Sequence, residues 1–492
     1  MEKIKREAGV LLPVSALPSP YGIGCFSKEA YDFVDMLSAS GQSVWQILPL
    51  CPTAYGDSPY QSPASFGGNP YYISLDQLLE EGLLKKEELP QVKDETEVDY
   101  GKLYNERYPV LYQAFLRFSS LPKPSDYRAF IEENRDWLED TALFMAIKKS
   151  LYGAPIHGFP RELLERQNDA VRKAKEELSE EIDFWRFMQY KFFTQWRALR
   201  AYANSRGIKI MGDLPIYVSA DSAEVWAEPE LFCLDENKRP TCVAGCPPDK
   251  FSPAGQLWGN PLYRWENHKK DNFSWWKRRF SQGLSMYDIL RIDHFRGFEA
   301  YYSIPFGALN ARDGQWQKGM GRELFGEIRK ELGNVELIAE DLGFITDEVE
   351  KLRDDFGFLG MKILQFGFDG EDEHLPYEYR ENCVAYTGTH DNPTLTEWLG
   401  ELSAEGELRL RRYLGEPFTP KGALRDKVIS LGMMSGAGLC VIPMQDYLGI
   451  GKEGRINRPA TTSGNWKWRM KKEDISEKTG AKIKDLTKIY GR

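Results

Sequence analysis

The chain has 492 residues, of which 42 % are hydrophobic, 28 % charged and 13 % aromatic, and its formal net charge is −10. This composition is typical of a folded, soluble protein that buries a large core. The negative charge argues against a general binder of nucleic acid or of an anionic membrane, because either partner requires a basic face. A neutral, polyhydroxylated substrate is compatible with it.

The seven cysteines are scattered without the spacing of a disulfide framework, which is typical of a protein in the reducing cytoplasm. Cys242 and Cys246 have the spacing of half a zinc site, but no second pair or suitably spaced His completes it. Glu2, Glu7 and Pro13 interrupt the segment that a signal peptide would need, and no run of about 18 apolar residues occurs. We therefore expect a cytoplasmic protein with no metal, no cofactor and no membrane partner.

Short apolar runs recur along the chain, and helical patterns separate most of them. The eight runs are residues 9–13, 44–49, 208–215, 289–293, 335–341, 361–366, 384–387 and 439–443. Strands that alternate with helices in this way predict a (β/α)8 TIM barrel of the α/β class. A doubly wound sheet is the alternative on the pattern alone.

Two longer segments lie between these runs. Residues 75–206 carry helical patterns without a convincing strand, so they predict a mostly helical insertion between strands 2 and 3. Residues 216–270 are irregular and contain several Pro, Phe and Trp residues. They predict a loop-rich insertion over the active site, between strands 3 and 4. Without an internal repeat or a low-complexity linker, residues 1–492 are expected to form a single barrel that carries both insertions.

Acidic residues end several of the predicted strands. Asp213 ends the third strand, Asp293 the fourth and Glu340 the fifth, and Asp391 follows the seventh. Because barrel enzymes build their active sites at the C-terminal ends of the strands, these carboxylates should meet at one mouth. Arg291 shares a strand face with Asp293. A buried guanidinium has to be paired, so we expect Arg291 to keep Asp293 ionised, with a purely structural ion pair as the alternative.

Glycosyl transfer requires carboxyl groups of this kind. Asp293 suits the nucleophile because Arg291 would hold its charge. Glu340 suits the general acid and base, since two neighbouring carboxylates would raise its pKa and keep it protonated. Asp391 is the third group, which supports an oxocarbenium-like transition state. A Mg²⁺ or Mn²⁺ site built from the same acids is the alternative, although it would not explain the arginine.

Several segments resemble the amylomaltase, or 4-α-glucanotransferase, family, which is glycoside hydrolase family 77 within the α-amylase clan. The most specific are GDLPIYV (212–218), RIDHFRGF (291–298), IAEDLG (338–343) and TGTHDN (387–392). Others are SPYGIG (19–24), DSPYQSP (57–63), FSPAGQLWGNPLY (251–263) and SGNW (463–466). The resemblance extends from residue 8 to residue 469.

The resemblance implies a TIM barrel that transfers part of a maltooligosaccharide or other 1,4-α-glucan to the 4-hydroxyl of a glucose or oligosaccharide acceptor, with retention of configuration. It implies that Asp293 is the nucleophile, Glu340 the acid/base and Asp391 the transition-state stabiliser. It also implies substrate contacts by Tyr60, Asp213, Arg291, His294, His390, Phe251, Gln256 and Trp258. The last three lie on a loop that covers the glucan in this family.

Some alternatives remain open at this point. An α-glucan hydrolase could use the same carboxylates, and a glucan-binding or scaffold protein could carry them as structural ion pairs. His294 can line the substrate site only if its strand ends before it, because side chains alternate along a strand. Tyr55, close to Tyr60, is expected to pack against the protein and not to form a second glucan site.

Overall fold

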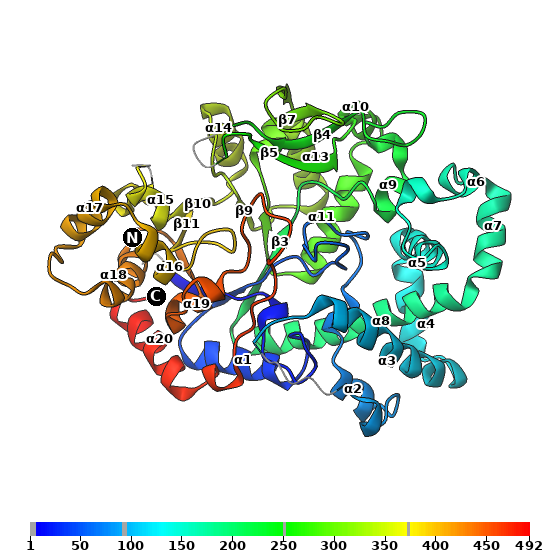
Figure 1. The fold of residues 1–492 in the computed structure, drawn as a ribbon, viewed down its shortest axis with the longest axis horizontal. Helices are drawn as coiled ribbons and strands as arrows, with labels where there is room; N and C mark the ends of the chain where they lie inside the picture. The colour runs from blue at the N-terminus through cyan, green and yellow to red at the C-terminus, as the bar shows by residue number, and fades with distance from the viewer. Residues whose placement is uncertain (1–5, 91–95, 249–251, 371–373) are drawn as a thin grey trace.

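The computed structural model describes residues 6–90, 96–248, 252–370 and 374–492. Its largest sheet has eight strands, all paired in parallel, in the order β10-β11-β12-β1-β2-β3-β6-β9 (Figure 1). The strands are β1 (Glu7–Leu11), β2 (Val44–Gln46), β3 (Lys209–Leu214), β6 (Ile289–Ile292), β9 (Leu337–Ala339), β10 (Gly360–Ile363), β11 (Cys383–Tyr386) and β12 (Leu439–Pro443).

The sheet closes between β9 and β10. The Ala339 N–H donates to the Leu359 carbonyl (2.8 Å), and the Leu359 N–H donates to the Leu337 carbonyl (3.1 Å). A doubly wound sheet stays open. The predicted (β/α)8 barrel is therefore confirmed and the doubly wound alternative is excluded.

Each predicted apolar run overlaps one strand, but several strands are shorter than predicted, and in β10 and β9 the difference matters most. β10 ends at Ile363, and residues Leu364–Phe368 form helix α15. Periodicity does not separate a short apolar strand from a buried helical turn, which explains the error. β9 ends at Ala339, so Glu340 follows this strand and does not belong to it.

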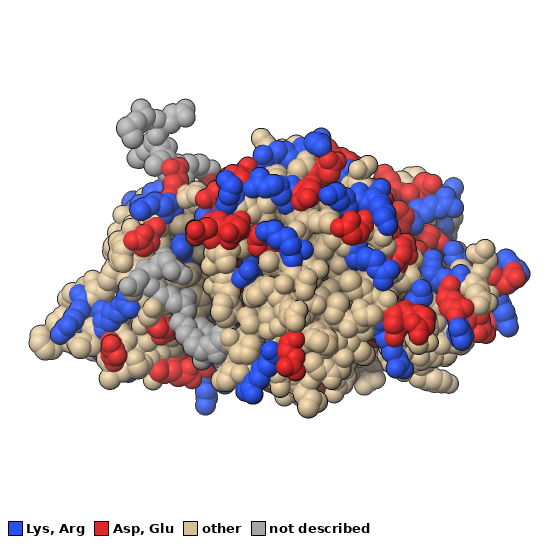
Figure 2. Space-filling model, turned by 90° about the horizontal axis from the view of Figure 1, so that it is seen from above, with Lys and Arg blue, Asp and Glu red and all other residues tan. Residues whose placement is uncertain are grey.

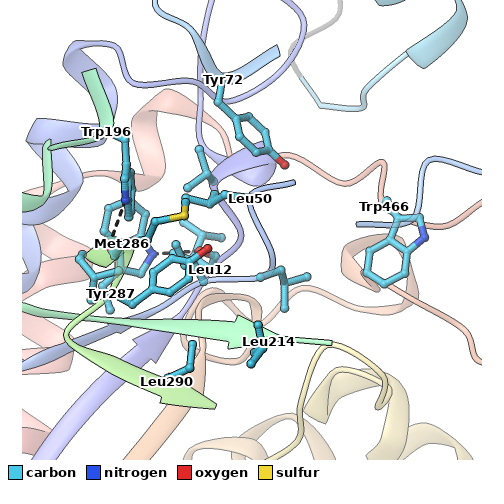
Figure 3. Packing of buried hydrophobic residues seen from close by; sticks show 14 of the residues in the cluster. Leu12, Leu50, Tyr72, Trp196, Leu214, Met286, Tyr287, Leu290 and Trp466 are labelled. Atoms are coloured by element: carbon cyan, nitrogen blue, oxygen red, sulfur yellow. Dashed lines mark hydrogen bonds between the residues drawn. The ribbon is translucent and has the colours of Figure 1, made fainter. Parts of the chain in front are cut away.

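Side chains on the inner faces of the strands form one compact hydrophobic cluster. Its buried members are Leu11, Val44, Met211, Ile289, Ile338, Met361, Ile363, Val384, Tyr386, Leu439 and Val441. Alternate residues such as Val10 and Leu290 face outward and join a larger cluster beneath the helices. Figure 3 shows part of that layer, where Trp196 donates a hydrogen bond (3.0 Å) to the Met286 carbonyl above Leu290.

Helices fill the chain between β2 and β3, on the right of Figure 1. They are α2 (Leu75–Glu80), α3 (Tyr100–Ser120), α4 (Ser125–Glu133), α5 (Arg135–Ser150), α6 (Arg161–Leu164), α7 (Asn168–Glu177) and α8 (Ser179–Ser205). No named strand lies among the described residues of 75–206. The aromatic side chains of α8 are buried against the larger cluster, since one face of this helix covers β3 and the helices around it.

A second, four-stranded antiparallel sheet lies above the barrel in Figure 1, in the order β5-β4-β7-β8. Its strands are β4 (Cys242–Cys246), β5 (Gln256–Pro261), β7 (Ala300–Pro305) and β8 (Gln315–Lys318). The sequence predicted no strand within 216–270, and this was wrong for β4 and β5. Both are short and interrupted by Gly or Pro, and β4 pairs with a strand that follows β6, so no local pattern signals them.

The remaining helices pack around the barrel. They are α1 (Lys28–Ala39), α9 (Ala223–Ala227), α10 (Trp265–Lys270), α11 (Ser274–Met286), α12 (Arg296–Glu299), α13 (Gly321–Leu332), α14 (Asp347–Phe356), α16 (Leu395–Glu401), α17 (Ala404–Leu414), α18 (Lys421–Met434), α19 (Met444–Leu448) and α20 (Glu477–Ile489). Thr487 of α20 accepts a hydrogen bond from Gln42 (2.7 Å), which joins the two ends of the chain.

In the face shown by Figure 2, Lys and Arg are interspersed with Asp and Glu, and much of the centre is uncharged. A nucleic-acid backbone would find no continuous basic track on that face. Within the described part of the chain, none of the helices has the length and apolar character needed to span a membrane.

Gly212 tests the packing next to the strand-end acids. A Cβ at this position would overlap the buried ring of Tyr287, so we expect Gly212→Ala to lower the free energy of unfolding by about 1–3 kcal/mol. Thermal unfolding followed by circular dichroism measures this as a fall in melting temperature.

The control is Gly326→Ala in α13, where no described atom outside the local helix backbone lies within 4 Å of the added Cβ. This variant should melt at or above the wild-type temperature, because Ala favours helix. Equal melting of the two variants would contradict the packing argument.

Candidate active site

The C-terminal ends of four barrel strands carry the predicted acids. Asp213 lies in β3, and Asp293 and Glu340 directly follow β6 and β9. Asp391 lies in the loop after β11. In a closed parallel barrel these ends surround one mouth. Arg291 contacts Asp213, Asp293 and Glu340, and Asp391 is joined to Asp213 through His390 and Tyr60.

The guanidinium of Arg291 lies at the centre of this group, and its side chain is only 3 % exposed. It is 2.5 Å from Asp213, 3.1 Å from Glu340 and 3.4 Å from Asp293. The pair of Arg291 and Asp293 that the sequence predicted is present, but Asp213 lies closer to the guanidinium. Asp213 is opposite Arg291 in the register of β3 and β6, whereas Asp293 lies beyond the end of β6.

Tyr60 and His390 extend the network on one side. The Tyr60 hydroxyl donates to Asp213 Oδ2 (2.7 Å) and lies 3.0 Å from His390 Nε2. Because this hydroxyl has a single proton, we assign His390 Nε2 as the donor in the second contact. Burial lowers the pKa of His390, so the ring is neutral at neutral pH. The Tyr60 and His390 ring planes are only 10° apart, and their centroids are separated by 5.3 Å.

Asp391 is held by the segment that follows β12. Asn457 Nδ2 donates to Asp391 Oδ1 (2.7 Å), and the Asn457 N–H donates to the His390 carbonyl (3.1 Å). Arg455 donates to the Asp391 carbonyl (3.3 Å). The ring of Trp466 lies 5.9 Å from that of Tyr60. The sequence analysis missed Asn457 and Arg455, because neither directly follows a strand end: α19 lies between β12 and this segment. The SGNW segment was the one signal near them.

Asp293 and Glu340 have unusual electrostatics. Burial, followed by the charge of Glu340, raises the pKa of Asp293 well above its usual range, and Arg291 opposes this shift. Burial also raises the pKa of Glu340, against the effects of Arg291 and of the His294 N–H, which donates to Glu340 Oε2 (2.6 Å). Both carboxyls are therefore harder to ionise than a carboxyl in water, and a proton on either one relieves the repulsion between them.

Arg291 does not favour Asp293 over Glu340 in this geometry. Glu340 receives the shorter Arg291 contact and the backbone N–H. We expected Arg291 to keep Asp293 ionised. Arg291 does lower the pKa of Asp293, but burial and the charge of Glu340 outweigh it, so the expectation was wrong.

His294 lies next to the Asp293 and Glu340 carboxyls, and strand β5 of the second sheet packs against it. β6 ends at Ile292, and His294 has a left-handed backbone (φ +46°), so the strand has ended before this residue, as its predicted role required. The ring of Trp258 in β5 packs edge-on against His294 at 4.8 Å, and Trp258 donates to Gln256 Oε1 (3.0 Å). Burial lowers the pKa of His294 to about 3. Phe251, the third predicted residue of this loop, lies outside the described residues.

Tyr55 differs from expectation. Its side chain is fully exposed, so the prediction that it packs against the protein was wrong. The turn formers around it, including Gly56 with φ +92°, carry it away from Tyr60 and into solvent.

Removal of the arginine tests how far the site depends on it. We expect Arg291→Met to lower the free energy of unfolding by about 3–5 kcal/mol at pH 7, because it leaves buried carboxylates without a cation. Protonation of those carboxyls removes the unpaired charge. The free energy of unfolding of the variant should therefore come closer to that of the wild type as the pH falls from 7 to 5. Melting temperatures of both proteins, measured at both pH values, test this.

The double variant Asp213→Asn/Arg291→Met should recover part of the lost stability. An equal deficit at both pH values would contradict the electrostatic account.

Comparison with known proteins identifies the family. The sequence model of a family described as 4-alpha-glucanotransferase matches residues 12–475. The 4-alpha-glucanotransferase of Clostridium butyricum is 45 % identical over 485 residues, which cover 97 % of this chain and 99 % of that protein. That of Thermus thermophilus is 46 % identical over 502 residues and 100 % of both chains.

Solved structures agree with this result. The amylomaltase from Streptococcus agalactiae, determined in complex with acarbose, has a TM-score of 0.96 at 42 % identity and covers 99 % of this chain and 100 % of its own. The amylomaltase from Corynebacterium glutamicum shares the fold, with a TM-score of 0.77 at 19 % identity over 98 % of this chain and 75 % of its own. With relatives of about 45 % identity along its whole length, this chain belongs to the 4-α-glucanotransferase family of glycosyltransferases.

Proposed function

We propose that the enzyme transfers a segment of a maltooligosaccharide or other 1,4-α-glucan to the 4-hydroxyl of a glucose or oligosaccharide acceptor by a retaining double displacement. In this proposal Asp293 is the nucleophile and Glu340 the general acid and base. The observation that carries it is the contact of both carboxyls with the one buried guanidinium of Arg291. A pair that holds one proton can provide a charged nucleophile and an acid at the same pH.

In the first step the Asp293 carboxylate forms a bond to the anomeric carbon while Glu340 gives its proton to the departing glycosidic oxygen. In the free enzyme the His294 N–H and Arg291 stabilise Glu340 as a carboxylate, so donor binding has to move the shared proton to Glu340. In the second step Glu340 takes a proton from the acceptor 4-hydroxyl, whose oxygen replaces Asp293 at the anomeric carbon. Arg291 stabilises the charged member of the pair in each step.

Asp391 is the proposed stabiliser of the oxocarbenium-like transition state. Its side chain is 44 % exposed, and Asn457 and His390 contact the same oxygen, Oδ1. The second oxygen is therefore free to face a sugar ring. Asp213 Oδ1 is buried and has no hydrogen-bond partner among the described residues, which suits an acceptor for a sugar hydroxyl. Tyr60 provides an aromatic face beside these groups.

Transfer is favoured over hydrolysis when water is kept from the glycosyl-enzyme intermediate. Trp258, with its edge against His294, covers the site on the side of the second sheet. The names of the relatives favour the transferase over a hydrolase. The acarbose complex of the related amylomaltase supports the binding of a ligand of that kind in this cleft as well.

The reaction of maltotriose tests the proposal. The wild-type enzyme should convert it into glucose and longer oligosaccharides with no net gain of reducing ends, as chromatography and a reducing-end assay would measure. Asp293→Asn should lower the rate by a factor on the order of 10⁴ or more, because the covalent route is lost. A net gain of reducing ends equal to the glucose released would instead indicate hydrolysis.

A maltotriosyl fluoride donor separates the roles of the two carboxyls. Fluoride leaves without a proton, so Glu340→Gln should still release a burst of fluoride, whereas Asp293→Asn should release none. Circular dichroism of both variants checks that they are folded. A burst from Asp293→Asn together with none from Glu340→Gln would reverse the assignment.

Asn457 provides a test of how Asp391 is positioned. Asn457→Ala removes the 2.7 Å hydrogen bond to Asp391 Oδ1. We expect kcat to fall about tenfold, as for the loss of one hydrogen bond to a charged group. Asn465→Ala is the matched control, because among the described residues its side chain bonds with Thr461 and Arg458 of the same exposed turn and not with Asp391. Equal kcat values for the two variants would show that Asn457 does not position Asp391.

A further inference from the structure

Asp446 is a buried carboxyl group that the proposed reaction does not use. It lies in α19, which directly follows barrel strand β12, and it is only 1 % exposed. Burial raises the pKa of Asp446 to about 6, against the effects of hydrogen bonds from Leu395 and Thr387. At pH 7 the group is therefore mostly a carboxylate, and a carboxylate that is removed from water needs hydrogen-bond donors.

Both oxygens of Asp446 have such a donor. The Thr387 hydroxyl donates to Oδ2 (2.6 Å), and the Leu395 N–H donates to Oδ1 (2.7 Å). Thr387 is the first residue after β11, and Leu395 is the first residue of α16. The two donors therefore lie at the two ends of residues 388–394, the loop that carries Asp391. A single buried carboxylate thus joins both ends of this loop.

Hydrogen bonds within the loop connect its ends to Asp391. The Asn392 side-chain oxygen accepts from the Thr389 N–H (2.8 Å) and from the Thr389 hydroxyl (2.9 Å). The Asp391 N–H donates to Thr389 Oγ1 (3.3 Å). Near the other end, the buried Gln365 side chain donates to the Pro393 carbonyl (2.9 Å). A displacement of either end of the loop is therefore passed on to Asp391.

We propose that Asp446 is a positioning residue for the glycosyl transfer, which holds both ends of the 388–394 loop and thereby determines the position of the Asp391 carboxyl. Asp446 touches no substrate in this proposal and acts through Thr387 and Leu395. Asn457 holds the Asp391 side chain directly, whereas Asp446 holds its loop. The inference rests on the role proposed above for Asp391, because the position of this carboxyl affects the rate only if the group takes part in the reaction.

Two substitutions at Asp446 test the proposal. Asp446→Ala removes both hydrogen bonds, so kcat with maltotriose should fall about 10²-fold, as for a catalytic group displaced by about 1 Å. KM should change less, because Asp391 acts in the transition state. Asp446→Asn keeps an oxygen for the Leu395 N–H and offers an N–H to Thr387 Oγ1. Its kcat should therefore be at least about ten times that of Asp446→Ala.

Three outcomes would overturn the proposal: an Asp446→Ala enzyme with the wild-type kcat, a loss confined to KM, or equally low kcat values in the Ala and Asn variants. Circular dichroism at the assay temperature shows that both variants are folded.

Asp288→Ala is the matched control for a loss of stability. Asp288 also accepts a backbone hydrogen bond, from the Ile210 N–H (2.8 Å), but it precedes β6 and so lies at the opposite end of the barrel from the acids. This variant should melt at a lower temperature than the wild type and keep the wild-type kcat when it is assayed below that temperature. A fall in kcat equal to that of Asp446→Ala would show that destabilisation causes the effect, and the positioning role would be wrong.

A measurement on His390 separates this inference from the proposed function. His390 lies in the same loop as Asp391, and the chain has five histidines, so NMR of the histidine-labelled full-length protein can resolve their ring signals. The signal that is lost in His390→Gln belongs to His390. Asp446→Ala should shift this signal, and Asp288→Ala should not.

The His390 signal does not depend on turnover. If the wild type fails to convert maltotriose into glucose and longer oligosaccharides, the proposed function is wrong, while the signal still shows whether Asp446 holds the loop. An unchanged His390 signal in Asp446→Ala would overturn the inference whatever the reaction is.

Discussion

The buried guanidinium of Arg291 is the interaction on which the active site depends. It is the one cation in contact with Asp213, Glu340 and Asp293 among the ion pairs of the described residues. Without it these carboxyls would repel one another in a site with little water, and protonation would be the only relief. The register between β3 and β6 determines this arrangement, because it places Asp213 opposite Arg291. The same strand register that builds the barrel therefore also places the positive charge of Arg291 beside the acids.

Segments far from the barrel strands complete the site. Glu397 of α16 contacts Arg455 (3.4 Å), which in turn donates to the Asp391 carbonyl. The loop after β11 and the segment after β12 are thereby joined into one unit that holds Asp391. On the opposite side, the second sheet brings Trp258 to His294. The barrel supplies the carboxylates, and these two additions pack beside them, one against Asp391 and the other against His294.

The proton that the proposed mechanism places on the Asp293 and Glu340 pair connects the static structure with the proposed reaction. Contacts in the free enzyme favour the charge on Glu340, whereas the proposed first step needs it on Asp293. For the proton to move to Glu340, the contacts that stabilise its carboxylate have to weaken. These contacts come from the His294 N–H and from the Arg291 guanidinium. The left-handed conformation of His294 directs its N–H toward this carboxyl, so the turn after β6 takes part in setting the protonation of the site.

The fold was largely predictable because its signals are local. Each barrel strand overlaps one of the short apolar runs that the sequence shows. The second sheet was not predictable in this way, because β4 pairs with β7, which follows it by more than 50 residues and a barrel strand. The contacts of Asn457 and Arg455 with Asp391 likewise join distant parts of the chain and have no local signature.

The sequence by itself determined the barrel, the acids at its strand ends and, through its motifs, the family. Periodicity and residue type are properties of neighbouring residues, and they suffice for those conclusions. The tertiary structure decided which acid Arg291 approaches most closely and which of the two carboxyls, Asp293 or Glu340, has more contacts that favour its anion. These depend on burial and on distances through space, which strand register and loop packing create and no short segment contains.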